Sequence, residues 1–277
     1  MKFAVIATGA LLVLSAAAAH AQALPEKYKS AGKIVIGTTP NYPPVTFKDP
    51  ATNQLTGYDI EIGNAIGDKL GIKIEWQDTS FEQMISGVTT DRIDLILGGM
   101  NDLPARRETV DFIDYMKSGV QFFVQHKRSA EFKEAADLCG KTVGASRRTN
   151  FPKDIDAWSQ EWCVKAGKPA IKVQGTEGSA DARAQLRQGR IDAGAQGNES
   201  LPYLMKLDPD TYKLLGTPFA ITYQGIGVAK KNADLRDAVA GALKAMLTDG
   251  TYNKIVAKYE VQPSAITEVS INEVPLK

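Results

Sequence analysis

Two similar stretches of sequence decide the fold of this chain. "GKIVIGTTPNYP" (32–43) is echoed by "GKTVGASRRTNFP" (140–152), and each stretch runs from Gly-Lys through an apolar strand to an Asn-aromatic-Pro turn. A second pair follows in the same order, with "DRIDLIL" (91–97) echoed by "GRIDAGA" (189–195). Strand-like and helical patterns alternate throughout, which is typical of an α/β protein with largely parallel sheets. The echoes therefore predict two similar α/β lobes.

Each predicted lobe presents one loop after its first strand and another after its Arg-Ile-Asp strand. In open α/β sheets, ligands bind outside the carboxyl ends of the strands. Because all four loops come at such ends, two lobes that face each other would enclose one ligand in the cleft between them. The pattern thus predicts a binding architecture, and an enzyme only if the cleft also supplies acid–base groups.

The first residues have a different character from the rest of the 277-residue chain. Lys2 provides a basic start, an apolar stretch covers 4–19, and small residues at Ala19, Ala21 and their neighbours fit a cleavage site. This pattern predicts a secretory signal peptide over 1–23 and a periplasmic location. No later stretch reaches eighteen apolar residues, so we expect a soluble mature protein without direct membrane insertion.

The charge and the cysteines limit the possible functions. Loss of Lys2 with the signal changes the formal net charge from +1 to 0 (+1 − 1), and a neutral chain lacks the basic field that nucleic-acid binding needs. Cys139 and Cys163 are predicted to form a disulfide in an oxidising compartment. His126 is the one histidine left after processing. We therefore expect no metal site, no cofactor and no catalytic residues.

Five stretches carry a resemblance to a known family. They are "GTTPNYPP" (37–44), "LTGYDIEIGNAI" (55–66), "MNDLPARRETVDF" (100–112), "GKTVGAS" (140–146) and "DGTYNKIVAKY" (249–259). Together they make the chain similar to the family 3 periplasmic solute-binding proteins, the amino-acid-type binding components of ABC importers. The resemblance covers essentially the whole mature chain. It implies the type II periplasmic-binding-protein fold, in which two α/β lobes joined by a two-stranded hinge close on a ligand.

The resemblance also implies how the chain divides. Lobe 1 would take residues 26–118 and a return segment at 224–277, and lobe 2 would take 119–223. The hinge strands would lie near 117–122 and 220–226. The expected partners are a small carboxylate ligand and the membrane permease of an ABC importer, and we expect a monomer.

The family's carboxylate clamp falls on Arg106. A guanidinium suits this role because its planar fork meets a carboxylate with two parallel charge-assisted hydrogen bonds. Gly98 and Gly99 would let the backbone approach the ligand closely. Asn101 stands where the family has a Ser or Thr donor. The alternative for Arg106 is a cap on a surface helix.

Other family contacts also transfer by resemblance. Tyr42 matches the aromatic residue that stacks on the ligand and Phe81 its partner, although both could instead be core residues. Thr149 aligns with the hydroxyl that helps to hold the carboxylate. Arg148 stands before it where Gly is usual, so with Arg147 it is either a second anion site or part of a solvated turn. Asn150 could cap the helix that follows.

The most telling departure concerns the acid that pairs with the ligand's ammonium, because that position is Gly197 here. Glu199, two positions on, would substitute for the acid, or Asn198 would bond a neutral group. An ammonium without a carboxylate would be costly to desolvate. Thr39 replaces an acid found in binders of basic amino acids, which disfavours lysine- or arginine-like ligands.

We expect a ligand that is a polar or acidic amino acid. Three alternatives remain open at this point. In the first, the ligand lacks an amine, as a dicarboxylate does, and Arg147 or Arg148 is the second anion site. In the second, the protein is a periplasmic dehydratase-type enzyme on the same scaffold, with Glu199 as general acid. In the third, the protein presents its closed form to a separate membrane sensor.

Overall fold

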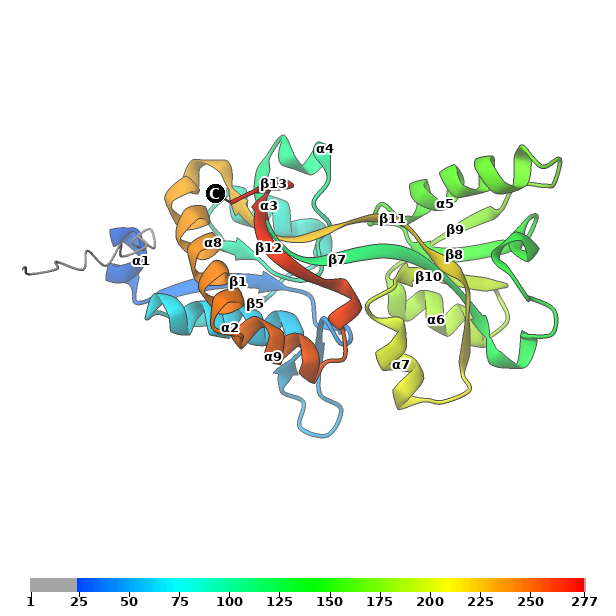
Figure 1. Ribbon diagram of the computed structural model, residues 1–277, viewed down its shortest axis with the longest axis horizontal. Coiled ribbons are helices and arrows are strands. Elements are labelled where there is room, and N and C mark those ends of the chain that lie inside the picture. Colours follow the sequence, from blue (N-terminus) through cyan, green and yellow to red (C-terminus); the bar gives the residue numbers. More distant parts are fainter. Residues whose placement is uncertain (1–23, 277) are drawn as a thin grey trace, which may run out of the picture.

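The computed structural model describes residues 24–276 and has two lobes side by side, crossed by two long strands (Figure 1). The predicted signal peptide at 1–23 lies outside the described residues. The long strands are β7 (Val110–Gln125) and β11 (Tyr212–Ala229), which pair antiparallel along their length. Because both strands pass from one lobe into the other, the predicted fold of two α/β lobes and a two-stranded hinge is confirmed.

The sequence echoes correspond to equivalent strands in the two lobes. The strands are β1 (Lys33–Thr38), β5 (Lys73–Asp78) and β6 (Leu95–Ile96) in lobe 1, and β8 (Thr142–Ser146), β9 (Lys172–Thr176) and β10 (Ala193–Gly197) in lobe 2. In lobe 1, β1 lies between β5 and β6, and in lobe 2, β8 lies between β9 and β10. All four pairings are parallel. The Gly-Lys stretches thus form the central strands, and the Arg-Ile-Asp stretches lead into β6 and β10.

Helices cover the strands of each lobe. In lobe 1 they are α1 (Glu26–Ala31), α2 (Tyr58–Leu70), α3 (Met84–Thr89), α4 (Pro104–Arg107), α8 (Ala233–Thr248) and α9 (Thr251–Lys258). In lobe 2 they are α5 (Phe151–Ser159), α6 (Ser179–Arg187) and α7 (Leu201–Leu207). Helix α2 ends at Gly71, whose left-handed φ of 64° suits a residue without a Cβ. Within residues 24–276, no helix is long and apolar enough to cross a membrane.

Short strands complete lobe 1. They are β2 (Asn41–Tyr42), β3 (Thr46–Lys48) and β4 (Leu55–Thr56), which form a separate small sheet, and β12 (Ala265–Ile271) and β13 (Val274–Pro275). Strand β12 pairs antiparallel with β7 beside the hinge. The end of the chain is therefore attached to the strand that links the lobes.

Each lobe has its own apolar core. The largest cluster draws on residues between 24 and 116 and again between 226 and 269, which places the chain's two ends in one lobe. A second cluster lies wholly between 120 and 219. We therefore propose that the lobes divide at 118/119 and 223/224, where the chain leaves one core for the other.

The hinge strands do not pair regularly between the lobes. The register of β11 against β7 shifts between Leu215 and Phe219, between Phe219 and Thr222, and again between Gln224 and Gly225. Such irregularities leave residues outside the ladder and allow strands to bend. The pair is regular before Leu215 and after Gly225, so we infer that bending of the two lobes is concentrated between these residues.

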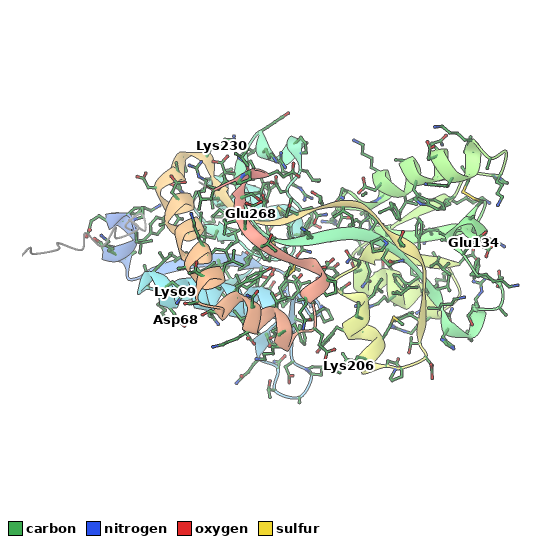
Figure 2. The ribbon with its side chains drawn as sticks, in the orientation of Figure 1. Asp68, Lys69, Glu134, Lys206, Lys230 and Glu268 are labelled. Atoms are coloured by element: carbon green, nitrogen blue, oxygen red, sulfur yellow. A yellow bond between two sulfur atoms is a disulfide. The ribbon has the colours of Figure 1, made fainter. Side chains whose placement is uncertain are left out.

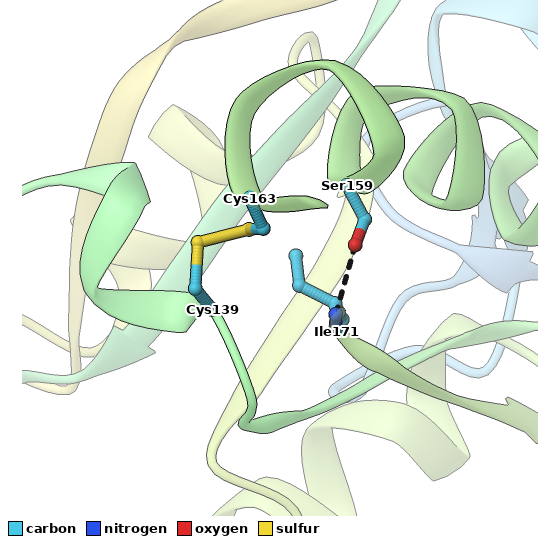
Figure 3. The surroundings of a disulfide bond; sticks show 4 residues. All are labelled: Cys139, Ser159, Cys163 and Ile171. Carbon is cyan, nitrogen blue, oxygen red and sulfur yellow. Dashed lines mark hydrogen bonds between the residues drawn. A yellow bond between two sulfur atoms is a disulfide. The ribbon is translucent and has the colours of Figure 1, made fainter. Parts of the chain in front are cut away.

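A disulfide fastens lobe 2 on the side away from the hinge. Cys139 and Cys163 are joined, as predicted (Figure 3). Cys163 is fully buried in the lobe 2 core and belongs to η4 (Gln160–Val164), a π-helical turn that continues α5. Close by, the Ile171 amide donates a hydrogen bond of 2.8 Å to the Ser159 hydroxyl. The two cysteines are 24 positions apart in the sequence. In the chain-entropy model, a disulfide that closes a loop of this length stabilises the fold by roughly 3–4 kcal/mol.

The lobes touch each other outside the hinge. Lys206, labelled in Figure 2, belongs to α7 of lobe 2 and pairs with Glu260 of lobe 1 at 2.5 Å. The rings of Phe47 and Tyr203 lie 5.7 Å apart across the same boundary. The molecule therefore has its lobes closed over the space between them.

Candidate functional site

A cleft lies between the lobes, where the loops after the parallel strands meet. It holds about 700 Å³ of empty space, its open mouth included, which is in the range of small-molecule sites. Most of the predicted contact residues line it, namely Tyr42, Phe81, Gly98, Gly99, Asn101, Arg106, Arg148 and Thr149. Loops after β1, β6 and β8 thus reach the cleft as predicted. The loop after β10 does not line it.

Arg106 presents a cation that forms no ion pair with the residues that the structure describes, although the nearby Asp102 carboxylate acts on its charge. Its Nη1 donates to the Asn101 carbonyl at 2.7 Å, and its guanidinium lies 5.6 Å from the centre of the Phe81 ring. Burial lowers the pKa of Arg106 from its ordinary value, which still leaves an arginine charged at neutral pH. Within residues 24–276 Arg106 forms no ion pair, whereas its neighbour Arg107 pairs with Asp102 and Glu273. Arg106 is therefore held in place and open to an anion.

The loop beside Arg106 rests on a buried carboxyl group. Gly99 has a left-handed φ of 67°, which favours glycine. Its amide donates to Asp59 Oδ2 at 2.9 Å, and Asp59 lies fully buried in the first turn of α2. Burial raises the pKa of Asp59 to about 8. Asp59 thus supports the glycine turn from below and does not enter the cleft itself.

Tyr42 joins the two lobes as well as lining the cleft. Its hydroxyl donates to Glu199 Oε1 at 2.9 Å and accepts from the Gly197 amide at 3.1 Å. Both partners belong to lobe 2, and Tyr42 belongs to lobe 1. The ring therefore has a fixed position in the closed molecule, as a stacking surface requires.

The turn after β8 forms the lobe 2 wall. Thr149 Oγ1 donates to the Ser146 carbonyl at 2.8 Å and accepts from the Phe151 amide at 3.2 Å. Asn150 does not cap α5 with its side chain. It instead accepts a hydrogen bond of 3.0 Å from the Asn101 amide group of lobe 1. Both lobes thus contribute to one continuous polar wall.

Arg148 already forms ion pairs with two acids of the protein. Its guanidinium pairs with Glu82 of lobe 1 and, at 3.2 Å, with Glu177 of lobe 2. Arg147 also pairs with Glu177. Both arginines lie exposed in the turn after β8, as the solvated-turn alternative describes, and there they form a cluster of two cations and two acids.

Glu199 and Asn198 do not line the cleft. Glu199 is 3% exposed and lies behind Tyr42 and Ser118. Its carboxylate accepts hydrogen bonds of 2.9 Å from the Tyr42 hydroxyl, the Ser118 hydroxyl and Gln224 Nε2. Burial raises the pKa of Glu199, and these donors oppose the rise. Asn198 is turned to the hinge, where its side chain accepts from the Gly119 amide at 2.7 Å.

Steric crowding explains why position 197 is a glycine. A Cβ at this position would overlap the carboxylate of Glu199 and the hydroxyl of Tyr42. The Glu199 carboxylate therefore fills the space that a side chain at position 197 would take. An acid is present at this end of the cleft, but it comes from two residues further along and is covered by hydroxyl groups.

Several cleft residues carry no sequence signal. Ser118 and Gln224 come from the hinge strands, and Glu82 and Glu177 from short turns in opposite lobes. They are ordinary polar residues without a distinctive motif. Only the pairing of β7 with β11 and the closure of the lobes bring them together.

Comparison with known proteins agrees with this architecture. The description of the bacterial extracellular solute-binding proteins, family 3, matches residues 34–262. The L-cystine-binding protein TcyA of Bacillus subtilis (strain 168) is 30% identical over 236 residues, which cover 83% of this chain and 82% of the relative.

Two solved structures are also similar. An ancestral arginine-binding protein bound to arginine has a TM-score of 0.70 and 31% identity, covering 82% of this chain and 98% of the other. The ancestral amino acid-binding protein AncCDT-1, a precursor of cyclohexadienyl dehydratase, has a TM-score of 0.73 and 27% identity, covering 84% and 98%. With its two lobes, its hinge and a match over most of its length, the chain belongs to the bacterial extracellular solute-binding proteins of family 3.

Proposed function

We propose that this protein captures a free α-amino acid in the cleft by closure of its lobes. The observation that carries the proposal is Arg106, a fixed guanidinium on the cleft wall without an acidic partner among the described residues. A ligand α-carboxylate would supply the missing charge with two hydrogen bonds. Each bond to a charged group contributes about 1.5–3 kcal/mol, so one clamp provides a large part of micromolar binding, near −8 kcal/mol.

The ligand's ammonium would lie at the Tyr42 end of the cleft. Tyr42 and Ser118 both donate their hydroxyl protons to Glu199. The Ser118 oxygen keeps its lone pairs as acceptors, whereas the Tyr42 oxygen already accepts from the Gly197 amide and keeps at most one lone pair for a ligand. The charge of Glu199 would then act on the ammonium through these two hydroxyl groups. This proposal keeps Glu199 as the compensating charge but makes it a buried one, with Tyr42 and Ser118 as the contacts.

The relatives support an amino acid as the ligand class. Two of them are described as binding L-cystine and arginine, respectively. An amine-free dicarboxylate has less support, because Arg148 is already paired with two acids. A dehydratase has less support as well, because the carboxyl group that would act as general acid lies behind Tyr42 and Ser118.

We further propose that the protein works in the periplasm as the soluble partner of an ABC importer. The family is extracellular, and residues 1–23 have the pattern of a cleaved signal peptide. The closed form would carry the amino acid to the permease, which would open the lobes to release it. We expect the protein to act as a monomer, since one chain supplies both walls of the cleft.

A thermal-shift screen of the mature protein tests the proposal. We expect an α-amino acid at about 100 times its Kd to stabilise the fold by about 2.7 kcal/mol. For a protein of this size, that corresponds to roughly 5–10 °C in the melting temperature. Succinate is the amine-free control, and recovery of the unchanged ligand after incubation tests for catalysis. A shift with succinate and none with amino acids, or conversion of the ligand, would contradict the proposal.

A further inference from the structure

Two buried aspartates meet behind the loop that carries Arg106. Asp102 is 1% exposed and lies two residues before α4, and Asp114 is fully buried on the hinge strand β7. Their carboxyl groups contact each other, and each acts on the pKa of the other. Two carboxyl groups that share a site do not both ionise readily, because like charges repel. We call these two residues the aspartate pair.

Hydrogen bonds to other groups leave one oxygen free on each carboxyl group. Asp102 Oδ1 accepts from Arg107 Nε at 2.5 Å. Asp114 Oδ2 accepts from the Ser270 hydroxyl at 2.5 Å and from the Glu273 amide at 2.9 Å. Asp102 Oδ2 and Asp114 Oδ1 are buried and have no hydrogen-bond partner among residues 24–276. One proton between these two oxygens would give both of them a partner, since a protonated carboxyl group is a donor.

Charged groups act on the aspartate pair from α4 and from the turn between β12 and β13. Arg107 pairs with Asp102, and its Nη2 lies 2.9 Å from a carboxylate oxygen of Glu273. Glu273 adds negative charge near Asp102. On the neighbouring strands, Gly225 of β11 and Ser270 of β12 stand opposite Asp114 and carry no charge. Loss of the shared proton therefore adds a negative charge to a site in which Arg107 already serves two acids.

The aspartate pair is attached to the peptide that holds Arg106. Arg106 Nη1 donates to the Asn101 carbonyl, whose peptide bond leads directly into Asp102. The Asp102 amide donates to the Tyr223 carbonyl at 2.8 Å, and the Asp102 carbonyl accepts from the Thr222 hydroxyl at 3.1 Å. Both partners belong to the hinge strand β11. The Asp102 carboxylate also acts on the charge of Arg106, so the pair is linked to the clamp by position and by charge.

We propose that the aspartate pair shares one proton and makes ligand affinity depend on pH, with Asp102 and Asp114 as positioning residues for Arg106. With the proton in place, the two carboxyl groups are bonded to each other and the loop before α4 is held against the hinge. Without it, the carboxylates repel each other, and the added negative charge opposes a ligand carboxylate at Arg106. This inference rests on the proposed binding of an α-amino acid.

The direction of the pH dependence follows from burial. Burial raises the pKa of both aspartates, and the charge of Asp102 adds to the rise at Asp114, whose pKa is about 7. An aspartate in an unfolded chain has a pKa of roughly 3.9. The folded protein thus retains a proton that the unfolded chain has lost, and the pair's contribution to stability decreases as the pH rises from about 4 to about 7. Ligand affinity should fall as the pH rises through about 7.

Asp114→Asn tests the pair, because its amide group can donate to Asp102 Oδ2, its oxygen can accept from Ser270, and it does not titrate. L-Glutamine, L-glutamate and L-arginine are the probes, since their side chains do not titrate near neutral pH. Titration calorimetry at about pH 6 and about pH 8 measures the affinities. We expect wild type to lose roughly fivefold in affinity over this range, the low end of usual coupling between sites, and Asp114→Asn to lose less than about twofold.

Asp111→Asn is the matched control on the same strand. Although burial opposes the shift, hydrogen bonds with Asn272 and Arg236 lower the pKa of Asp111, so this variant should keep the wild-type pH dependence. Asp102→Asn removes the same shared proton from the other partner, and it serves as the test if Asp114→Asn does not fold.

Two measurements separate this inference from the proposed function. Equal loss of affinity with pH in wild type and Asp114→Asn would overturn the role in ligand binding. Denaturant unfolding of the free proteins tests the shared proton without any ligand, and parallel pH curves for wild type and Asp114→Asn would overturn it. If wild type binds none of the three probes at either pH, the role in binding fails together with the proposed function, and the unfolding curves still decide whether the pair holds a proton.

Discussion

Two arginines on opposite walls of the cleft have the same chemistry and different surroundings. Arg106 of lobe 1 contacts a carbonyl and an aromatic ring, and it forms no ion pair with the described residues, Asp102 being paired with Arg107. Arg148 of lobe 2 lies between Glu82 and Glu177. An arginine is available to an anionic ligand only where the protein leaves it unpaired. The contrast therefore supports the proposal that the ligand's carboxylate binds at Arg106 of lobe 1.

The carboxyl groups near the cleft also differ in their surroundings. Glu82 and Glu177 are partly exposed and paired with arginines, whereas Glu199 and Asp59 are buried and held by hydroxyl and amide donors. The buried acids position other groups, Tyr42 in one case and the Gly99 turn in the other. Proximity to a cleft is thus not the same as facing it.

The largest effect should come from removing the open cation. Arg106→Ala deletes both hydrogen bonds to the ligand carboxylate, each of about 1.5–3 kcal/mol, and should weaken binding of every amino acid more than roughly 100-fold. Arg106→Lys keeps the charge but loses the planar fork, so its affinity for amino acids should lie between the affinities of wild type and Arg106→Ala. Titration calorimetry measures the affinities. An affinity that survives Arg106→Ala would remove the proposed contrast with Arg148.

A smaller effect on binding is expected from a substitution at Gly197, where the Glu199 carboxylate already fills the space for a side chain. Gly197→Asp would place its Cβ into the Glu199 carboxylate and the Tyr42 hydroxyl, and overpacking of this kind costs about 1–3 kcal/mol. Denaturant unfolding should show the loss of stability, and amino-acid affinity should fall with it. The double variant Gly197→Asp/Glu199→Ala frees this space and should recover stability relative to the single variant. A single variant as stable as wild type would show that Glu199 does not occupy this space.

The smallest effect on ligand affinity is expected at Asp59, which does not enter the cleft and whose titration appears in the pH dependence of stability. Asp59 has a folded-state pKa of about 8, against roughly 3.9 in an unfolded chain. Between these values the unfolded chain has lost a proton that the folded protein retains, so this group's contribution to stability decreases as the pH rises from about 4 to about 8. Asp59→Asn keeps an oxygen acceptor for the Gly99 amide and does not titrate.

The Asp59→Asn variant should therefore have a shallower decline in its free energy of unfolding over this range. Denaturant unfolding at several pH values measures the difference from wild type. Other buried groups set the background, since Tyr115 contacts Asp59 and Glu199 adds a nearby negative charge. Parallel pH curves for the two proteins would mean that Asp59 is ionised in the folded state.

Much of the fold was predictable because it depends on patterns that the chain carries locally. The alternation of strand-like and helical patterns predicted an α/β chain, and the paired Gly-Lys stretches predicted the equivalent strands β1 and β8. The disulfide followed from two cysteines in a chain with a secretion signal. The loops after β1, β6 and β8 could be assigned to a cleft because parallel strands end at one edge of a sheet.

The sequence by itself determined which charged side chains could contact a ligand, but it did not determine their partners. Arg106 and Arg148 were candidates for a carboxylate, and Glu199 was a candidate for an ammonium group. Only the tertiary structure decided that Arg106 is open, that Arg148 is shared by two acids and that Glu199 lies behind hydroxyl groups. The physical reason is that the free energy of a charge depends on its burial and on nearby opposite charges, and those neighbours come from distant parts of the chain.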